Sequence, residues 1–134
     1  MPSRNDRKYT TTHEWILNDG TKMGITPHLA AQLGTATNVD SLPLTVATST
    51  PGQDVGQLKG TLNGNATSVV IHSPGGGHMD RHDWLNDGLP ASDITANPYD
   101  NYLYQLSAGA DANTPGLMTA AEYDAYLARI SVGG

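Results

Sequence analysis

The chain has 134 residues, of which 37% are hydrophobic and 6% aromatic, and it contains neither Phe nor Cys. Seven basic and 13 acidic residues give a formal net charge of -6, so the basic face that nucleic-acid binding requires is lacking. Without Cys, disulfides and thiol catalysis are excluded, and with no membrane-length apolar run we expect a cytoplasmic protein that does not enter the membrane.

The N-terminal residues predict a disordered start followed by a hairpin. Residues 1–7 are polar, and we expect them to be disordered and to precede a single domain over residues 8–134. A strand is predicted over residues 13–17 and a return strand over residues 21–25. The turn between them, residues 18–20, ends in Asp-Gly, and glycine accepts the positive φ that a tight hairpin turn needs.

A short helix signal follows the hairpin directly. Thr26 is placed to accept from the first free amides, and Pro27 fits the first helical position. Leu29 and Leu33 then fall on one face, and Gly34 ends the pattern.

The middle of the chain has fewer strand signals. Residues 45–56 predict an extended loop or an irregular hairpin, and residues 58–67 are rich in Asn and Gly and poor in strand formers. Residues 68–72 form the most strand-like run, which a Pro-Gly turn ends. A last strand is predicted over residues 102–106.

A C-terminal helix is predicted near residues 120–130. Thr119 and Glu122 have the spacing of a capping box. The helix carries one apolar stripe, which consists of Tyr123, Tyr126, Leu127 and Ile130.

Several short motifs occur in an order that resembles the glycine cleavage system H-protein family, the lipoyl carriers of that system. They are Lys8-Tyr9-Thr10, His13-Glu14-Trp15, Gly24-Ile25-Thr26, Leu33-Gly34 and the helix over residues 117–127. The resemblance implies a mainly β, lipoyl-domain-like barrel-sandwich hybrid, with a short helix after the first hairpin and a C-terminal helix.

The resemblance also implies a function. An H-protein is a non-catalytic, monomeric shuttle that carries lipoate in amide linkage to one lysine at a hairpin tip. Its partners would be the glycine decarboxylase, aminomethyltransferase and dihydrolipoyl dehydrogenase components. On this basis we expect a protein that is not an enzyme.

The attachment lysine of the family is not preserved in this chain. Counting back from Pro74, as in the family motif, places the lipoyl position at Ala66. The chain has three lysines, and Lys8 and Lys22 belong to the N-terminal block, which leaves Lys59 as an alternative attachment point seven positions earlier. We therefore expect lipoate to be absent. The alternative function is a non-lipoylated binding or decoy module, or an inactive relative of natural or artificial origin.

A group of His and Asp residues suggests a second alternative. If the segment is extended, His78, Asp80 and His82 point to one side, a spacing compatible with metal ligands. The order departs from known metallo-hydrolase motifs, so a polar, solvent-facing strand is favoured over a metal-binding protein.

Overall fold

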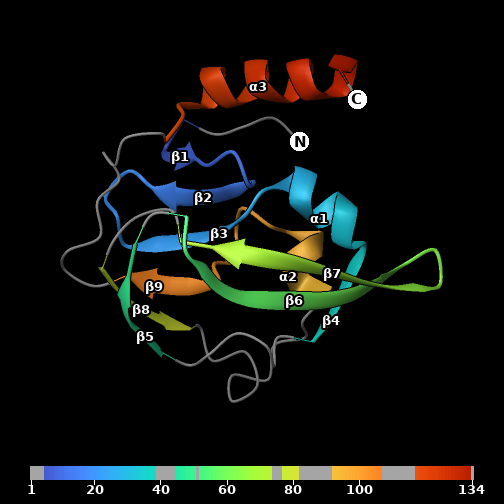
Figure 1. Cartoon of the computed structure of the whole chain (residues 1–134), viewed down its shortest axis with the longest axis horizontal. Helices are drawn as coiled ribbons and strands as arrows, with labels where there is room; N and C mark the ends of the chain where they lie inside the picture. Colours follow the sequence, from blue (N-terminus) through green and yellow to red (C-terminus); the bar gives the residue numbers. More distant parts are fainter. Residues whose placement is uncertain are drawn as a thin grey trace.

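The structure is a computed structural model that describes residues 5–38, 45–50, 52–73, 77–81, 92–106 and 117–133. Its larger sheet has the strand order β1 (Arg7–Tyr9), β2 (Glu14–Leu17), β3 (Lys22–Ile25), β9 (Tyr104–Leu106), β8 (Gly77–Arg81) and β5 (Thr45–Ser49). The smaller sheet consists of β4 (Thr35–Asn38), β6 (Asp54–Leu62) and β7 (Asn65–His72). The helices in these ranges are α1 (Pro27–Leu33), α2 (Ser92–Ala96) and α3 (Ala120–Gly133), and α3 lies beside β1 (Figure 1). None of these helices is long and apolar enough to cross a membrane.

The first hairpin and its helix form where the sequence predicts them. Strands β2 and β3 pair antiparallel, with Trp15 opposite Gly24, and the turn glycine Gly20 has φ 76°. Helix α1 begins with Pro27, and the hydroxyl of the N-cap Thr26 accepts from the amide of Leu29 at 3.4 Å. The residue that ends the helix, Gly34, has φ 86°.

The inner core lies between the two sheets and beneath α1. One set of side chains comes from the larger sheet and a second set from the smaller sheet and the helix. All are fully buried: Ile16, Met23, Ile25, Leu33, Leu58 and Ile71. Alternation along β2 and β3 places Ile16, Met23 and Ile25 on the face that looks toward the smaller sheet.

An outer, aromatic core covers the opposite face of the first strands. Tyr9 stacks on Tyr123 of α3, with ring centres 4.6 Å apart and planes 5° apart. Trp15 is 2% exposed and contacts Gly24, where a Cβ would stand 2.6 Å from the indole ring. Arg7, placed by the sequence in the disordered N-terminal segment, lies in β1 and is 4% exposed.

The middle of the chain contains more regular structure than its composition indicates. β5 occupies residues 45–49, and β6 and β7 form a long hairpin where strand formers are few. The hairpin closes through Asn63 and Gly64, whose φ values are 53° and 82°. Burial of Val55, Leu58 and Ile71 on its inner face replaces the missing β propensity.

The C-terminal part combines a confirmed helix with one that the sequence did not indicate. In the capping box of α3, the Glu122 carboxylate accepts from the Thr119 amide at 2.9 Å, and the Thr119 hydroxyl accepts from the Glu122 amide at 3.2 Å. Helix α2 was not predicted, and β9 is shorter than the predicted strand. The predicted turn at 74–76 lies outside the described residues.

Candidate functional site: the β6–β7 hairpin and its base

The β6–β7 hairpin is the longest ladder of the fold, and its end projects past α1 (Figure 1). Pairing runs from Asp54 opposite His72 to Leu62 opposite Asn65, and the turn residues are exposed. The C-terminal end of α1 holds the hairpin, because the Thr67 hydroxyl donates to the carbonyl of Leu33 at 2.5 Å. The tip is therefore presented by a supported two-stranded arm.

Ala66 lies on the outer face of this arm, two residues past the turn. It pairs with Thr61, while Lys59 pairs with Ser68. All four side chains are exposed, whereas the alternate pair of Leu58 with Val69 faces inward. The structure thus brings the two predicted site positions onto one face as diagonal neighbours, with Lys59 in mid-strand and neither position in the turn itself.

The turn was present in the sequence as a readable signal. Asn-Gly between two runs is the strongest short hairpin indicator, because both residues take positive φ in a type I′ turn. Asn63 and Gly64 carry that signal, whereas the count back from Pro74 leads to Ala66. The observed tip precedes Ala66 by two residues.

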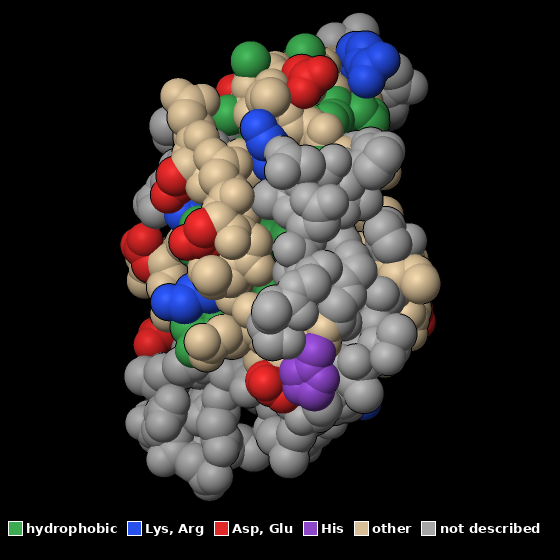
Figure 2. Space-filling view, turned by 90° about the vertical axis from the view of Figure 1, so that its left-hand side faces the viewer, with side chains coloured by type: hydrophobic (Ala, Val, Ile, Leu, Met, Phe, Trp, Pro, Cys, Tyr) green, Lys and Arg blue, Asp and Glu red, His purple; other side chains and the backbone are tan. Residues whose placement is uncertain are grey.

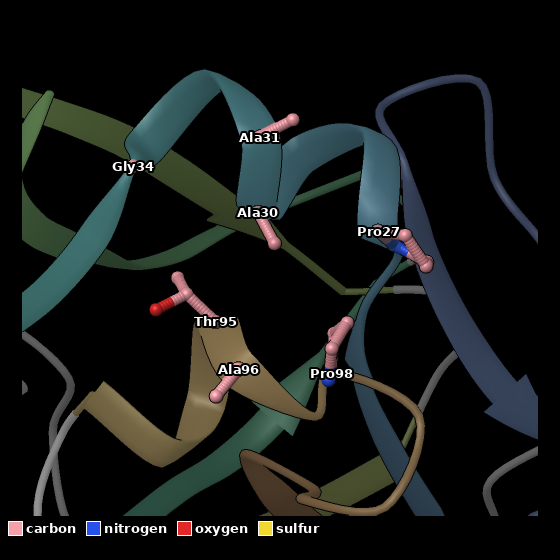
Figure 3. A pocket seen from close by; sticks show the side chains of 7 residues that line it. All are labelled: Pro27, Ala30, Ala31, Gly34, Thr95, Ala96 and Pro98. Atoms are coloured by element: carbon pink, nitrogen blue, oxygen red, sulfur yellow. The ribbon is translucent and has the colours of Figure 1, made fainter. Parts of the chain in front are cut away.

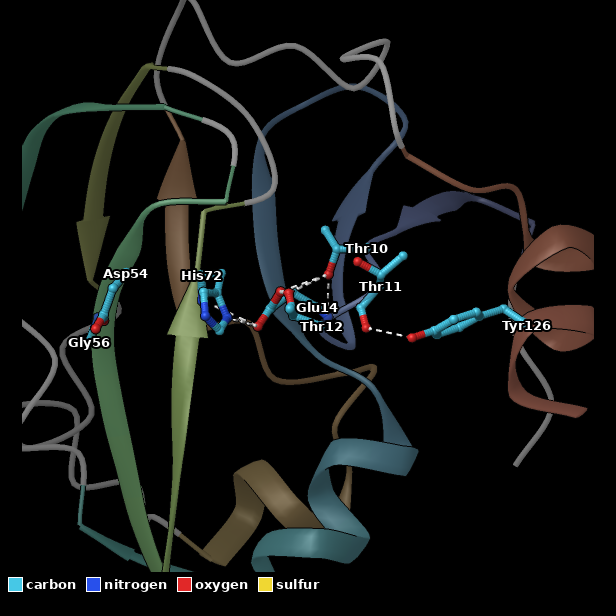
Figure 4. A network of polar contacts seen from close by, with 8 residues as sticks. All are labelled: Thr10, Thr11, Thr12, Glu14, Asp54, Gly56, His72 and Tyr126. Atoms are coloured by element: carbon cyan, nitrogen blue, oxygen red, sulfur yellow. Dashed lines mark hydrogen bonds and ion pairs between the residues drawn. The ribbon is translucent and has the colours of Figure 1, made fainter. Parts of the chain in front are cut away.

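A buried carboxylate anchors the base of the hairpin to the first sheet (Figure 4). Glu14 is fully buried and accepts from the hydroxyls of Thr10, at 2.7 Å, and of Thr12. Its second oxygen accepts from the amide of His72 at 3.2 Å and lies 3.3 Å from Nδ1 of that imidazole. Burial raises the pKa of Glu14, and the hydrogen bonds from Thr12, Thr10 and His72 oppose this rise. The sequence pointed to Glu14 only as part of a family motif, not as this link.

A second polar cluster joins α1 and α3 to the loop before β2. His13 has φ 70°, its Nδ1 lies 2.8 Å from the hydroxyl of Tyr123, and its ring centre is 4.2 Å from that of His28. The Tyr123 hydroxyl also lies 2.9 Å from that of Thr26. Burial, and to a smaller degree His28, lowers the pKa of His13 to about 4. Tyr126 adds a further tie, because its hydroxyl donates to the carbonyl of Thr11 at 3.2 Å (Figure 4).

The predicted metal ligands do not form a metal site in the described residues. His78 Nε2 lies 3.0 Å from an Asp80 oxygen on β8, and both side chains are at least 40% exposed. His82 falls outside the described residues, and within them no group of three His, Cys, Asp or Glu side chains can hold an ion. Acidic and basic side chains are interspersed on the face in Figure 2, without a broad basic patch among the residues drawn in colour.

A cavity of about 210 Å³ lies between α1 and α2 (Figure 3). It is lined by small, mostly apolar residues: Pro27, Ala30, Ala31, Gly34, Thr95, Ala96 and Pro98. The Thr95 hydroxyl, its single polar side-chain group, donates to the Ser92 carbonyl and accepts from the Ala36 amide. The cavity therefore offers a ligand no uncommitted polar side chain.

Comparison with known proteins gives a consistent set of relatives, although no protein-family model matches the chain. The glycine cleavage system H protein of Sodalis glossinidius is 34% identical over 126 residues, which are 90% of this chain and 90% of that protein. The H protein of Nitratidesulfovibrio vulgaris is 33% identical over 130 residues, with 92% and 94% covered. A crystal structure of the H protein from Mycobacterium marinum superposes with a TM-score of 0.74 at 24% identity, over 94% of this chain and 99% of that one. This likeness confirms the predicted barrel-sandwich hybrid.

Proposed function

The chain belongs to the glycine cleavage system H protein family, and we propose that it retains the docking role of an H protein without carrying lipoate. The carrier role depends on an amide between the carboxyl group of lipoate and a lysine amine at the hairpin tip. The observation that carries the proposal is the outer face of the β6–β7 arm. At the expected position this face has Ala66, which has no amine.

None of the three lysines of the chain lies where the family attaches lipoate. Lys8 lies in β1 and Lys22 in β3, both in the sheet that does not contain the arm. Lys59 is on the arm but in mid-strand, opposite Ser68 and beside two buried residues, Leu58 and Gly60. An attachment enzyme that reads a lysine beside a tight turn would not find one here.

The partners that follow from family membership are the glycine decarboxylase, aminomethyltransferase and dihydrolipoyl dehydrogenase components. A family member that keeps the fold but has no lipoate would occupy their binding sites without passing on a group. We therefore propose a binding or decoy module that is not itself an enzyme. The histidine group on β8 supplies no observation in favour of the metal-binding alternative.

Restoring the amine tests the carrier half of the proposal. Ala66→Lys, co-expressed with a lipoate ligase and given lipoate, should gain the mass of a lipoyl group. Asn65→Lys is the matched control, because Asn65 is also exposed next to the turn but its side chain belongs to the other face of the arm. Equal modification of both variants would show that the outer face does not define the position. If Ala66→Lys folds but stays unmodified, Ala66 is not the equivalent of the lipoyl lysine.

Competition tests the docking half separately. The unaltered chain, added in excess to a reconstituted glycine cleavage system that contains a lipoylated H protein, should slow turnover, and more lipoylated H protein should relieve the inhibition. Turnover that stays constant at every excess would refute the decoy role and leave the loss of the carrier role intact.

A further inference from the structure

A second hollow, away from the β6–β7 arm, is lined by aromatic rings and by cationic side chains. It has a volume of about 230 Å³ and opens on the outer face of β1, β2 and β3, against the loop before β9. Its lining is Arg7, Trp15, Leu17, Lys22, Tyr99, Asp100 and Tyr102. Glu14, which contacts β7, alternates with Trp15 along β2 and so faces the other way. This hollow is therefore separate from the arm and from the proposed function.

The floor of the hollow contains a buried positive charge. The Arg7 guanidinium lies 4.4 Å from the centre of the Trp15 ring and 5.0 Å from that of Tyr99. Its Nη1 donates to the Tyr99 carbonyl at 3.0 Å, and its Nε donates to Asp6, whose side chain is 60% exposed. The Asp6 carboxylate accepts from Nη2 as well, at 3.1 Å, so the charge of Arg7 is largely compensated, and Arg7 shapes the floor of the hollow rather than attracting an anion.

Lys22 supplies the group that can bond a ligand directly. Its ammonium nitrogen lies 4.8 Å from the centre of the Tyr102 ring. In the described part of the chain neither a hydrogen bond nor an ion pair occupies this ammonium. The ammonium can donate one charge-assisted hydrogen bond to the carboxylate of a ligand. The Tyr102 ring beside it is an apolar surface on which the ring of that ligand can stack.

We propose that this hollow, named here the Arg7–Lys22 pocket, binds a small aromatic monocarboxylate. The volume is below the range of pockets that take drug-sized molecules, which limits the ligand to about the size of one ring and one acid group. Because Asp6 compensates the charge of Arg7, the Lys22 ammonium is the cation that faces a ligand, and one ammonium matches a single negative charge better than polyanions such as phosphate esters. A single carboxylate directed at Lys22 satisfies both conditions.

The proposal is tested by titrating the full chain with benzoate and measuring the chemical shifts of its backbone amides by NMR. Benzoate should bind saturably with a roughly millimolar Kd and should shift Leu17, Lys22 and Tyr102. Benzyl alcohol, a neutral molecule of similar shape, should bind at least about tenfold more weakly. Inorganic phosphate should cause no saturable shift at the same residues.

Variants locate the contact. Lys22→Met keeps the length of the side chain and should weaken benzoate about tenfold or more, whereas Lys59→Met makes the same charge change on the arm and should leave the affinity unchanged. If both variants weaken benzoate binding equally, the affinity depends on the net charge of the protein and not on Lys22, and the proposal is overturned. Equal binding of benzoate and benzyl alcohol by the unaltered chain would also overturn it, and that result does not depend on the folding of any variant.

Discussion

Two hairpins of this protein each turn at a glycine with positive φ but differ in length and in surroundings. The β2–β3 hairpin turns at Gly20 and the β6–β7 hairpin at Gly64, both with positive φ. The first is covered on both faces, by the inner core and by the aromatic core around Trp15. The second is covered on its inner face only, and its outer face is exposed around Ala66. Packing therefore constrains nearly every residue of the first hairpin, while the outer face of the second can lose a functional side chain at little cost to the fold.

The largest difference between the hairpins should be seen when one large side chain is removed from each. Trp15→Ala deletes a ring that is 2% exposed and should lower the free energy of unfolding by about 3–5 kcal/mol. Val70→Ala, on the exposed face of β7 with 40% of its surface accessible, should cost less than about 0.5 kcal/mol. Urea denaturation measures both changes. Similar losses for the two variants would remove the contrast on which this comparison rests.

Gly24 and Gly64 differ in the space around them in the same way as the hairpins to which they belong. Gly24→Ala pushes a methyl group into the Trp15 ring, and such overpacking should cost about 1–3 kcal/mol. Gly64→Ala meets no atom within 4 Å, so its cost of about 1 kcal/mol should come from positive φ alone. Combining each change with Trp15→Ala separates the two causes in chemical denaturation. In the Trp15→Ala background, Gly24→Ala should cost less unfolding free energy, whereas the cost of Gly64→Ala should stay the same. An unchanged cost of Gly24→Ala would mean that the indole ring is not what the added methyl group meets.

Acid should destabilise the packing over the first hairpin, because His13 must gain a proton there. Its pKa in the folded protein is about 4, below the ordinary value of 6.5, so the unfolded chain binds the extra proton first and stability falls as pH drops from about 6.5 to 4. Since the side chain is only partly buried, screening reduces the effect to the order of 1–2 kcal/mol. The raised pKa of Glu14 acts in the opposite direction, because it lowers stability as pH rises above about 4.5.

The His13→Asn variant isolates the contribution of the imidazole, since Asn tolerates the positive φ at this position. Thermal unfolding from pH 7 to pH 4 should show a smaller loss of Tm in this variant than in the unaltered chain. Parallel curves for the two proteins would assign the acid sensitivity to other groups.

The smallest expected effect concerns the start of α3. Thr119→Ala removes the hydroxyl that accepts from the Glu122 amide and should cost about 1 kcal/mol or less, because the site is exposed. Thr61→Ala, on the outer face of the arm, is a matched control that breaks no cap and should cost less. If Thr119→Ala leaves Tm unchanged, the capping box does not stabilise α3, and the packing of Tyr123 is sufficient to hold the helix.

The same contrast explains which parts of the fold the sequence predicts. Around residues 13–34, the Asp-Gly turn, the Thr26 cap, Pro27 and Gly34 are local signals that agree with one another. In β6 and β7 the strands depend on contacts distant in sequence, such as Leu58 and Ile71 in the inner core, so local propensity underestimates them. Helix α2 has five residues and is equally dependent on packing, through Ile94. For the site, the absence of a lysine and the Asn63-Gly64 turn two residues before Ala66 were readable, but the placement of Ala66 and Lys59 on one exposed face required the observed pairing.

Intact mass measures whether the folded β6–β7 arm has an amine that accepts a lipoyl group. The unaltered chain is co-expressed with a lipoate ligase in medium with lipoate, beside a lipoylated H protein as a positive control. We expect the control to gain the lipoyl mass and this chain to keep the mass of its sequence. A lipoyl group on this chain, mapped to Lys59 after digestion, would show instead that the carrier role is kept and that the carrier position lies in mid-strand.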